Sequence, residues 1–311
     1  MNARPLVPSL FVLVLLAISA CQGDSKADSA PRARSVGEQS SSSEPPAQPS
    51  SSAGTTTSPG DPAYITARAS TGTKPCGILG AEGRVWVSNY ADNTLVWIDP
   101  ESLNISKPIA VGSSPCGLAF GGGSIWVENY GSNDVTRVNA STGAVQATIA
   151  VGSQPFDVTY ADGAAWVTDY ADGTVSRIDA ATNKRTAIRV GDLPVGIAPT
   201  HGAVWVPLQA DSRVVRIDTA TAKVTARVRV GKGPAWTAYD DGNVWVGNQT
   251  DGSVTRIDAS SGRVVATTKV GGTPLDGDVV GNSVWVPDKS GQLSRIDIRS
   301  ARSQTEWSRQ H

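Results

Sequence analysis

A tryptophan recurs at a nearly fixed interval along most of this 311-residue chain. The intervals are 40, 40, 39, 40 and 40 residues, and the positions are Trp86, Trp126, Trp166, Trp205, Trp245 and Trp285. Two other motifs keep the same interval: Val-Gly-x-x-Pro ahead of each later unit, and Arg-apolar-Asp/Asn after the tryptophan from the second unit on. A period of this size predicts a repeat protein whose units bury their apolar faces against their neighbours.

Each unit contains four short segments rich in β-branched or aromatic residues. In the second unit they are residues 117–120, 124–129, 135–138 and 145–151. Turn residues separate them, including a glycine three positions before the tryptophan in five of the six units. This composition predicts four strands joined by tight turns. No stretch keeps a 3.6-residue apolar period, so we expect almost no helix.

Six units of four strands predict an all-β fold, a six-bladed β-propeller over residues 63–311. Closure of such a ring removes the exposed edges of its sheets. Residues 64–70 align with the fourth strand of a unit but follow no first three strands, whereas the last unit has three clear strands ending near Ile298. We therefore expect the N-terminal strand to complete the last blade. The tail at residues 303–307 aligns with the same position and remains the alternative.

The N-terminus carries an export signal. Arg4 precedes an apolar run over residues 6–18, which is too short for a comfortable membrane span. The sequence Ile-Ser-Ala-Cys ending at Cys21 resembles a bacterial lipobox, and the resemblance implies that residues 1–20 are cleaved and Cys21 is lipidated. The alternative is an ordinary signal peptide with an incidental cysteine. Residues 21–62 are rich in Ser, Pro, Ala and Gly and predict a disordered linker. We expect a propeller tethered to the outer face of a bacterial cell membrane.

Charge and cysteine content narrow the class further. Residues 63–311 contain 23 Lys/Arg and 23 Asp/Glu, and this balance disfavours nucleic-acid binding. Cys76 and Cys116 occupy the same position of adjacent units, each within Pro-Cys-Gly. An extracytoplasmic location permits a disulfide, but equivalent positions in adjacent blades are expected to lie too far apart to bridge. Two buried thiols are the favoured interpretation, and the pairing stays open.

The repeat resembles YVTN-type, surface-layer-like propeller repeats, with kinship to NHL repeats and to virginiamycin B lyase propellers. The string Ser-Ile-Trp-Val-Glu-Asn-Tyr from residue 124 is representative, and the resemblance covers residues 64–300. It implies the fold rather than one activity, because one fold hosts many functions. The lyase kinship implies a histidine base and a metal on the face that carries the loops after the second strands. His201 is expected in a turn on the opposite face and His311 ends the chain, so an enzyme is not the favoured interpretation.

Positions shared by all units are expected to be scaffold, and positions that differ are the candidates for a site. Two residues after the leading proline the units read Gly77, Gly117, Asp157, Gly196, Trp236 and Asp276. Asp278 follows along the same strand, and Glu128 stands where other units have Ser, Thr, Pro or Gly. We predict that Asp157, Trp236, Asp276, Asp278 and Glu128 line the ligand-facing side of the channel mouth.

Three tyrosines follow the second strands of the first three units, on the same expected face: Tyr90, Tyr130 and Tyr170. Aromatic rings beside carboxylates suit a small polar ligand, a glycan or a protein segment. The alternative is that the tyrosines are turn residues of the repeat and the acids are solvated.

The favoured function is a monomeric, membrane-anchored module that binds a ligand or a protein. No cofactor is predicted, although Ca²⁺ or Mg²⁺ could bind the four acids Asp157, Asp276, Asp278 and Glu128, because both ions prefer oxygen ligands. A cation there would favour the second interpretation, a metal-dependent lyase or lactone hydrolase. A ring that serves only as a structural spacer is the third.

Overall fold

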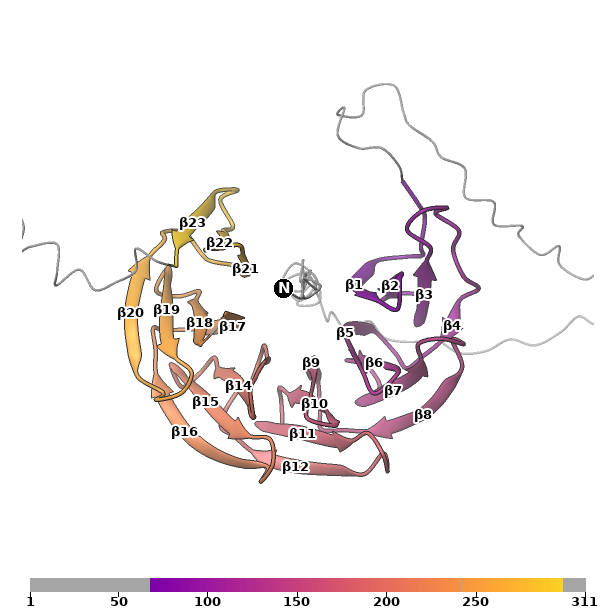
Figure 1. Cartoon of the computed structure of the whole chain (residues 1–311), viewed down its shortest axis with the longest axis horizontal. Helices are drawn as coiled ribbons and strands as arrows, with labels where there is room; N and C mark the ends of the chain where they lie inside the picture. The colour runs from indigo at the N-terminus through magenta and orange to yellow at the C-terminus, as the bar shows by residue number, and fades with distance from the viewer. Residues whose placement is uncertain (1–67, 241, 299–311) are drawn as a thin grey trace, which may run out of the picture.

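A computed structural model describes residues 68–240 and 242–298 of the chain. These residues form strands β1 to β23 in six antiparallel sheets, in which neighbouring strands follow one another in sequence. Figure 1 shows the sheets succeeding one another round an arc as blades, with the first strand of each nearest the centre. The predicted all-β, six-bladed propeller is confirmed. The described part of the chain contains no helix long and apolar enough to cross a membrane.

The strand bounds follow the repeat. Blades 1 to 3 comprise β1 (Pro75–Ala81), β2 (Arg84–Asn89), β3 (Thr94–Ile98), β4 (Ile109–Ala110), β5 (Pro115–Gly121), β6 (Ser124–Asn129), β7 (Asp134–Asn139), β8 (Val145–Ala150), β9 (Pro155–Ala161), β10 (Ala164–Asp169), β11 (Thr174–Asp179) and β12 (Arg185–Arg189). Blades 4 to 6 comprise β13 (Ala198–Thr200), β14 (Ala203–Leu208), β15 (Arg213–Asp218), β16 (Lys223–Arg229), β17 (Pro234–Asp240), β18 (Asn243–Asn248), β19 (Ser253–Asp258), β20 (Val264–Lys269), β21 (Asp278–Val280), β22 (Ser283–Pro287) and β23 (Leu293–Asp297).

Two inner strands are shorter than their equivalents, and proline explains why. β13 and β21 have three residues each, whereas β1, β5, β9 and β17 have seven. The strands beside them carry Pro207 and Pro287, which lack the N–H that would extend the ladder. One hydrogen bond remains at each proline. The N–H of Val195 donates to the Pro207 carbonyl, and the N–H of Leu275 donates to the Pro287 carbonyl.

The tryptophan series forms the core between blades. The first five members are 0–1% exposed, and each packs on the blade that follows; Trp166, for example, clusters with Ile197 and Val204 of blade 4. A buried tryptophan removes roughly 200 Å² of surface from water, which stabilises by up to about 5 kcal/mol before entropy is counted. Trp285 in blade 6 is only half-buried, because it lies at the end of the arc.

Arginines cover most of these rings, and some of them tie one blade to the next. Arg137 lies 4.8 Å from the ring centre of Trp126, and equivalent pairs occur in blades 3, 5 and 6. In blade 1 Trp97 takes the arginine position, and Arg84 lies 4.2 Å from its ring centre. The Arg84 and Arg137 guanidinium groups also donate to carbonyl groups of the following blade. Both series are scaffold, as predicted.

The pairing of the two mature cysteines differs from the favoured expectation. Cys76 and Cys116 form a disulfide, with Cα atoms 5.0 Å apart. Sequence reasoning overestimated this distance, because the inner strands β1 and β5 approach closely where neighbouring blades converge on the channel. The hydroxyl of Ser88 also donates to the carbonyl of Cys116 across the same junction.

Closure of the last blade lies outside the described residues. Blade 6 has three strands, β21, β22 and β23. Residues 68–70 belong to no strand. Residues 64–67 and the alternative segment 303–307 are not described. The signal peptide, Cys21 and the linker at residues 21–62 also lie outside the described part.

Candidate functional site

The position two residues after the leading proline points toward the next blade. In blade 1 a side chain at Gly77 would overlap the carbonyl oxygen of Cys116 in blade 2. In blade 3 the Asp157 carboxylate accepts a hydrogen bond from the N–H of Ile197 in blade 4. In blade 5 the Trp236 ring lies against Gly277 in blade 6. A large residue at this position, such as Asp157 or Trp236, fills the junction between neighbouring inner strands, whereas a glycine leaves room for the backbone of the next blade.

A polar side chain on the second strand usually satisfies the N–H of this position. The Ser88 hydroxyl accepts from the Gly77 N–H at 2.8 Å, and the Thr168 hydroxyl accepts from the Asp157 N–H at 3.1 Å. In blade 2 the acceptor is Oε2 of Glu128, which accepts from the Gly117 N–H at 3.0 Å. In this blade a carboxyl oxygen therefore replaces the hydroxyl as acceptor, and the second carboxyl oxygen, Oε1, is not needed for this hydrogen bond.

Glu128 is a buried acid with one unpartnered oxygen. It is 1% exposed, and its Oε1 is buried without a hydrogen-bond partner. Burial raises the pKa of Glu128 well above its usual range; the Gly117 N–H opposes this shift, and the negative charges of Asp157 and Asp134 add to it. A raised pKa favours the protonated form of Glu128, and that form can donate a hydrogen bond.

Asp157 lies on β9 in the adjacent blade. Its Oδ1 accepts from the Val158 N–H at 2.8 Å and its Oδ2 from the Ile197 N–H at 3.1 Å. The side chain is half-buried, and burial raises its pKa to about 7 although both N–H groups lower it; the negative charge of Asp276 raises it further. Asp157 can thus change its charge near neutral pH.

The two remaining acids lie in blade 6. Asp276 precedes β21, and its Oδ1 accepts from the Gly277 N–H at 2.8 Å. Asp278 begins β21, and its Oδ1 accepts from the Val279 N–H at 2.7 Å. Burial raises the pKa of Asp278, which is half-buried. The negative charge of Asp157 raises the pKa of Glu128, and the negative charge of Asp276 raises the pKa of Asp157. Three of the predicted acids are therefore linked electrostatically through Asp157.

Trp236 occupies a different environment from the open channel wall expected for it. It is 5% exposed, and its ring covers Gly247 in its own blade and Gly277 in the next. Both glycines are required, because a side chain at either would overlap the ring. The indole Nε1 is buried without a hydrogen-bond partner. Trp236 therefore forms the buried wall directly behind the Asp276 backbone.

The tyrosines lie on the face expected for them. The N–H groups of Tyr90, Tyr130 and Tyr170 donate to carbonyl groups in the loops that precede β1, β5 and β9. The Tyr170 ring also stacks on Phe156, with centroids 5.9 Å apart, and Phe156 directly precedes Asp157. Tyr170 is thereby tied to the strand that carries the acid.

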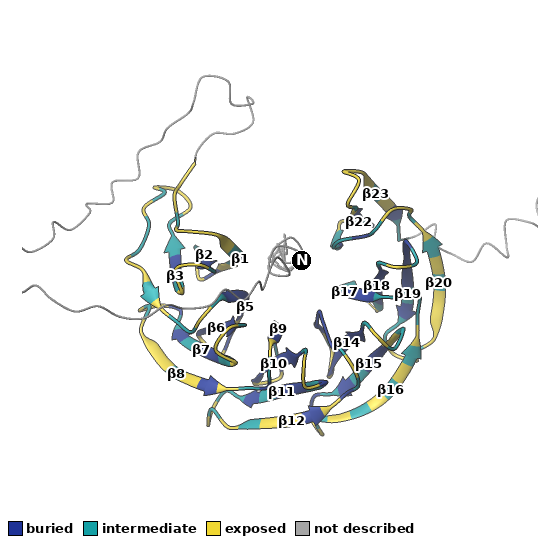
Figure 2. Cartoon of the chain, turned by 180° about the vertical axis from the view of Figure 1, so that it is seen from behind, coloured by how far each residue is buried: buried dark blue, intermediate teal, exposed yellow. Residues whose placement is uncertain are grey.

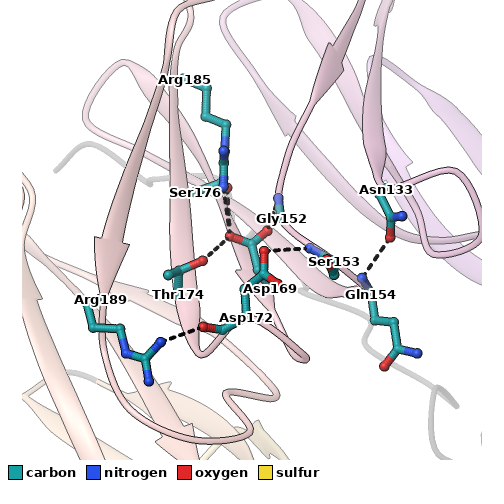
Figure 3. Close-up of polar contacts among 10 residues, drawn as sticks. All are labelled: Asn133, Gly152, Ser153, Gln154, Asp169, Asp172, Thr174, Ser176, Arg185 and Arg189. Atoms are coloured by element: carbon teal, nitrogen blue, oxygen red, sulfur yellow. Dashed lines mark hydrogen bonds and ion pairs between the residues drawn. The ribbon is translucent and has the colours of Figure 1, made fainter.

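The residues just before the tyrosines hold the blades together. Asp169 in blade 3 accepts from the hydroxyls of Thr174 and Ser176 and from the Gly152 N–H (Figure 3). Asn89, Asn129 and Asn248 hold the same place in other blades, and each donates to hydroxyl groups of the third strand. This end of the second strand is scaffold, which leaves the Glu128–Asp157 junction as the place where acidic groups gather without a structural need.

The chemistry available at this junction is that of hydrogen bonding and proton exchange. Among residues 68–240 and 242–298, no group of three or more His, Cys, Asp and Glu side chains is arranged to hold a metal ion. His201 lies in the turn between β13 and β14 and contacts Tyr239. Sequence comparison of the units found every acid of the cluster, but it missed the backbone donors at Gly117 and Ile197, because N–H groups leave no mark on the sequence.

Comparison with known proteins supports the fold but no particular activity. No protein-family model and no curated protein sequence matches the chain. Among solved structures, the chain is similar to the computationally designed Ika8 protein with a TM-score of 0.66 and 15% identity, over 72% of this chain and 71% of that one. It is similar to a streptogramin B lyase with a TM-score of 0.53 and 18% identity, over 73% and 94% of the two chains. A chain of the mitotic checkpoint complex matches with a TM-score of 0.64 and 11% identity, over 72% and 74%.

Fold and comparisons together define the class: the chain is a β-propeller built from six repeats of one unit. The identities are low, so the likeness carries the architecture and not the activity.

Proposed function

We propose that this chain is a lipid-anchored, extracytoplasmic propeller that binds a small cationic or hydrogen-bonding ligand beside Glu128 and Asp157. The observation that carries the proposal is the buried, unpartnered Oε1 of Glu128 next to a carboxyl group whose pKa is about 7. A buried polar atom without a partner costs about 1–3 kcal/mol. A scaffold could avoid this cost with the serine or threonine that blades 1 and 3 use.

The charges of the cluster suit an amine. Above pH 7 Asp157 is ionised and attracts a cation, while the unpartnered Oε1 of Glu128 is free to form a hydrogen bond with the same ligand. The Tyr170–Phe156 stack lies beside Asp157 and supplies aromatic groups near the cluster. Aromatic and polar groups that converge in this way are typical of small-molecule sites.

The anchor is proposed from the sequence. The apolar run at residues 6–18 ends at Ala20-Cys21, as in a lipobox. The 41 residues from Gln22 to Pro62 are poor in apolar side chains and, as a flexible coil, would span roughly 35 Å. The Cys76–Cys116 disulfide is consistent with export, because disulfides persist in oxidising compartments.

A metal-dependent lyase or lactone hydrolase is the second candidate. The observation in its favour is the pair of carboxyl groups with raised pKa values, because such groups act as general acids and bases near neutral pH. A titration with Ca²⁺ and Mg²⁺ distinguishes it: a cation that raises the melting temperature of the parent, and not of an Asp157→Asn variant, would favour the enzyme.

Calorimetry with alkylamines, amino sugars and neutral sugars tests the binding proposal. We expect the amines to bind, with an affinity that rises as the pH increases through 7 and Asp157 ionises. Replacing Asp157 and Asp276 together by glycine restores the residue found in blades 1, 2 and 4. This double variant should stay folded and bind amines at least about tenfold more weakly, because two charged hydrogen-bond acceptors are lost.

A charge-matched control separates the site from general electrostatics. Asp192→Asn with Asp211→Asn removes the same charge from loops on the tyrosine face and should bind amines as the parent does. If the glycine variant unfolds, or binds as tightly as the parent, Asp157 and Asp276 are scaffold. If none of the three compound classes binds the parent, the small-ligand proposal fails.

A further inference from the structure

Positive charge is concentrated in one part of the ring. The chain as a whole has a net charge of −1, yet residues 184–232 contain nine lysines and arginines and only three acids, Asp192, Asp211 and Asp218. This stretch includes β12 and β16, the outermost strands of blades 3 and 4. Both views of the molecule show these two strands side by side on the outer rim of the arc (Figures 1 and 2).

Alternate residues of β16 face solvent, and three of them are basic. Lys223, Arg227 and Arg229 are exposed, and no acid lies on this strand. On β12 the end residue Arg189 is also exposed, and its guanidinium lies 3.6 Å from the exposed Asp192 carboxylate. The outer strands of blades 2 and 5, β8 and β20, carry only Lys269 between them. Basic residues commonly protect outer strands from pairing with other chains, but protection alone would spread them over every blade.

One cross-strand pair is unfavourable as the protein stands. Arg213 on β15 lies directly opposite Arg229 on β16 in the register of blade 4. Like charges at directly opposed positions destabilise a sheet. Among the described residues, neither arginine makes an ion pair or a side-chain hydrogen bond, whereas the cations equivalent to Arg229 donate to turn carbonyls: Arg189 to Asp172 and Lys269 to Asp251. The two arginines of blade 4 thus lack the structural role of their counterparts.

We propose that this basic strip, defined as Arg189, Arg213, Lys223, Arg227, Arg229 and Lys232, docks on the anionic phospholipid headgroups of a membrane. The strip lies on the convex outer rim of the ring, which fits a surface rather than a small molecule. Headgroup phosphates between Arg213 and Arg229 would offset their repulsion through bidentate hydrogen bonds. Arg227 also donates to the Val190 carbonyl, which fixes the direction of its side chain toward blade 3.

The inference rests on the proposed function in one respect: the lipid on Cys21 would hold the ring close to the bilayer. Docking by the rim would set the ring on its edge, with the channel axis along the membrane plane. Both mouths of the channel would then stay open to solvent, and the Asp157 junction would remain accessible to a soluble ligand.

Sedimentation with lipid vesicles tests the strip. The full chain carrying Cys21→Ala, which removes the anchor, is mixed with vesicles of phosphatidylglycerol and phosphatidylcholine in equal parts. Vesicles of phosphatidylcholine alone set the baseline for any contribution of the apolar residues 6–18. We expect binding to the anionic vesicles that disappears in high salt. Arg213→Gln with Arg229→Gln should weaken it about 25-fold, because each basic residue near the surface contributes roughly fivefold.

A control with the same charge loss decides between a strip and net charge. Lys107→Gln with Arg263→Gln removes two exposed cations from blades 1 and 5 and should leave vesicle binding within about twofold of the parent. Equal weakening by both double variants, or no binding of the parent to anionic vesicles, overturns the proposal. So does a short DNA duplex that binds the parent more tightly than the vesicles do. None of these outcomes alters amine binding at Asp157, so the two proposals fail separately.

Discussion

Replacing Asp157 by asparagine should stabilise the protein, and the gain should depend on pH. Asparagine keeps the shape and never ionises, but its single carbonyl oxygen can accept from only one of the two N–H groups, Val158 and Ile197, that the carboxylate accepts from. The carboxyl group of Asp157 has a pKa of about 7 in the folded chain, against about 3.9 in an unfolded one. Between these values the folded state holds a proton that the unfolded state has released.

The sign of the effect follows from this difference. Because the folded pKa is raised, the parent loses stability as the pH rises from about 4 to about 7, and the loss is complete above 7. A shift of about three pKa units corresponds to at most about 4 kcal/mol. Solvent reaches the half-buried side chain, so we expect the stability of Asp157→Asn relative to the parent to rise by about 2–4 kcal/mol between pH 4 and pH 8.

Urea unfolding followed by tryptophan fluorescence at a series of pH values measures the gain. The slope of unfolding free energy against urea should match that of the parent, because the surface exposed on unfolding is unchanged. Asp258→Asn is a control of opposite sign: turn hydrogen bonds lower the pKa of Asp258 to about 2, so this variant should lose stability above pH 4. A gain at Asp157 that is independent of pH, or a loss at pH 8, would refute the burial argument.

Three further predictions concern the scaffold and the anchor. Trp166→Ala should lower the free energy of unfolding by about 3–5 kcal/mol, whereas Trp285→Ala should cost about 1–2 kcal/mol because its ring is half-exposed; equal losses in denaturant melts would contradict this. Replacing Cys76 and Cys116 by serine should cost about 4 kcal/mol, as expected for a cross-link over 40 residues, and a reducing agent should have no effect on that variant. Cys21→Ser should abolish labelling with a fatty-acid probe in a bacterial host, and retained labelling would exclude the lipobox.

Repetition made the fold predictable from sequence. The tryptophan, arginine and proline motifs each recur six or five times, so an error in one unit is corrected by the others, and the strand predicted over residues 124–129 matches β6. Features that occur once had no such support. The disulfide depends on how closely β1 and β5 approach, which is a property of the assembled ring and not of either unit.

The candidate site was predictable in its residues but not in its geometry. Departures from the repeat drew attention to Asp157, Trp236 and Asp276, and the structure directs the first two toward the next blade. Whether a side chain there meets a donor, a void or solvent is decided by the neighbouring unit. Trp236, which was expected to line the ligand-facing side of the channel mouth, instead makes a buried contact with Gly247 and Gly277.

Complementarity between two positions of each blade explains why Glu128 stands out. The residue two positions after the leading proline and the residue opposite it on the second strand share one space: Trp236 faces Gly247, and Asp157 faces Thr168. In blade 5 a large residue faces a small one, as close packing requires. Glu128 opposite Gly117 fills its space and accepts from the Gly117 N–H through Oε2, but its Oε1 is buried without a partner. Packing and the Gly117 N–H account for the size of Glu128 and for one of its oxygens, and the second oxygen is what the binding proposal explains.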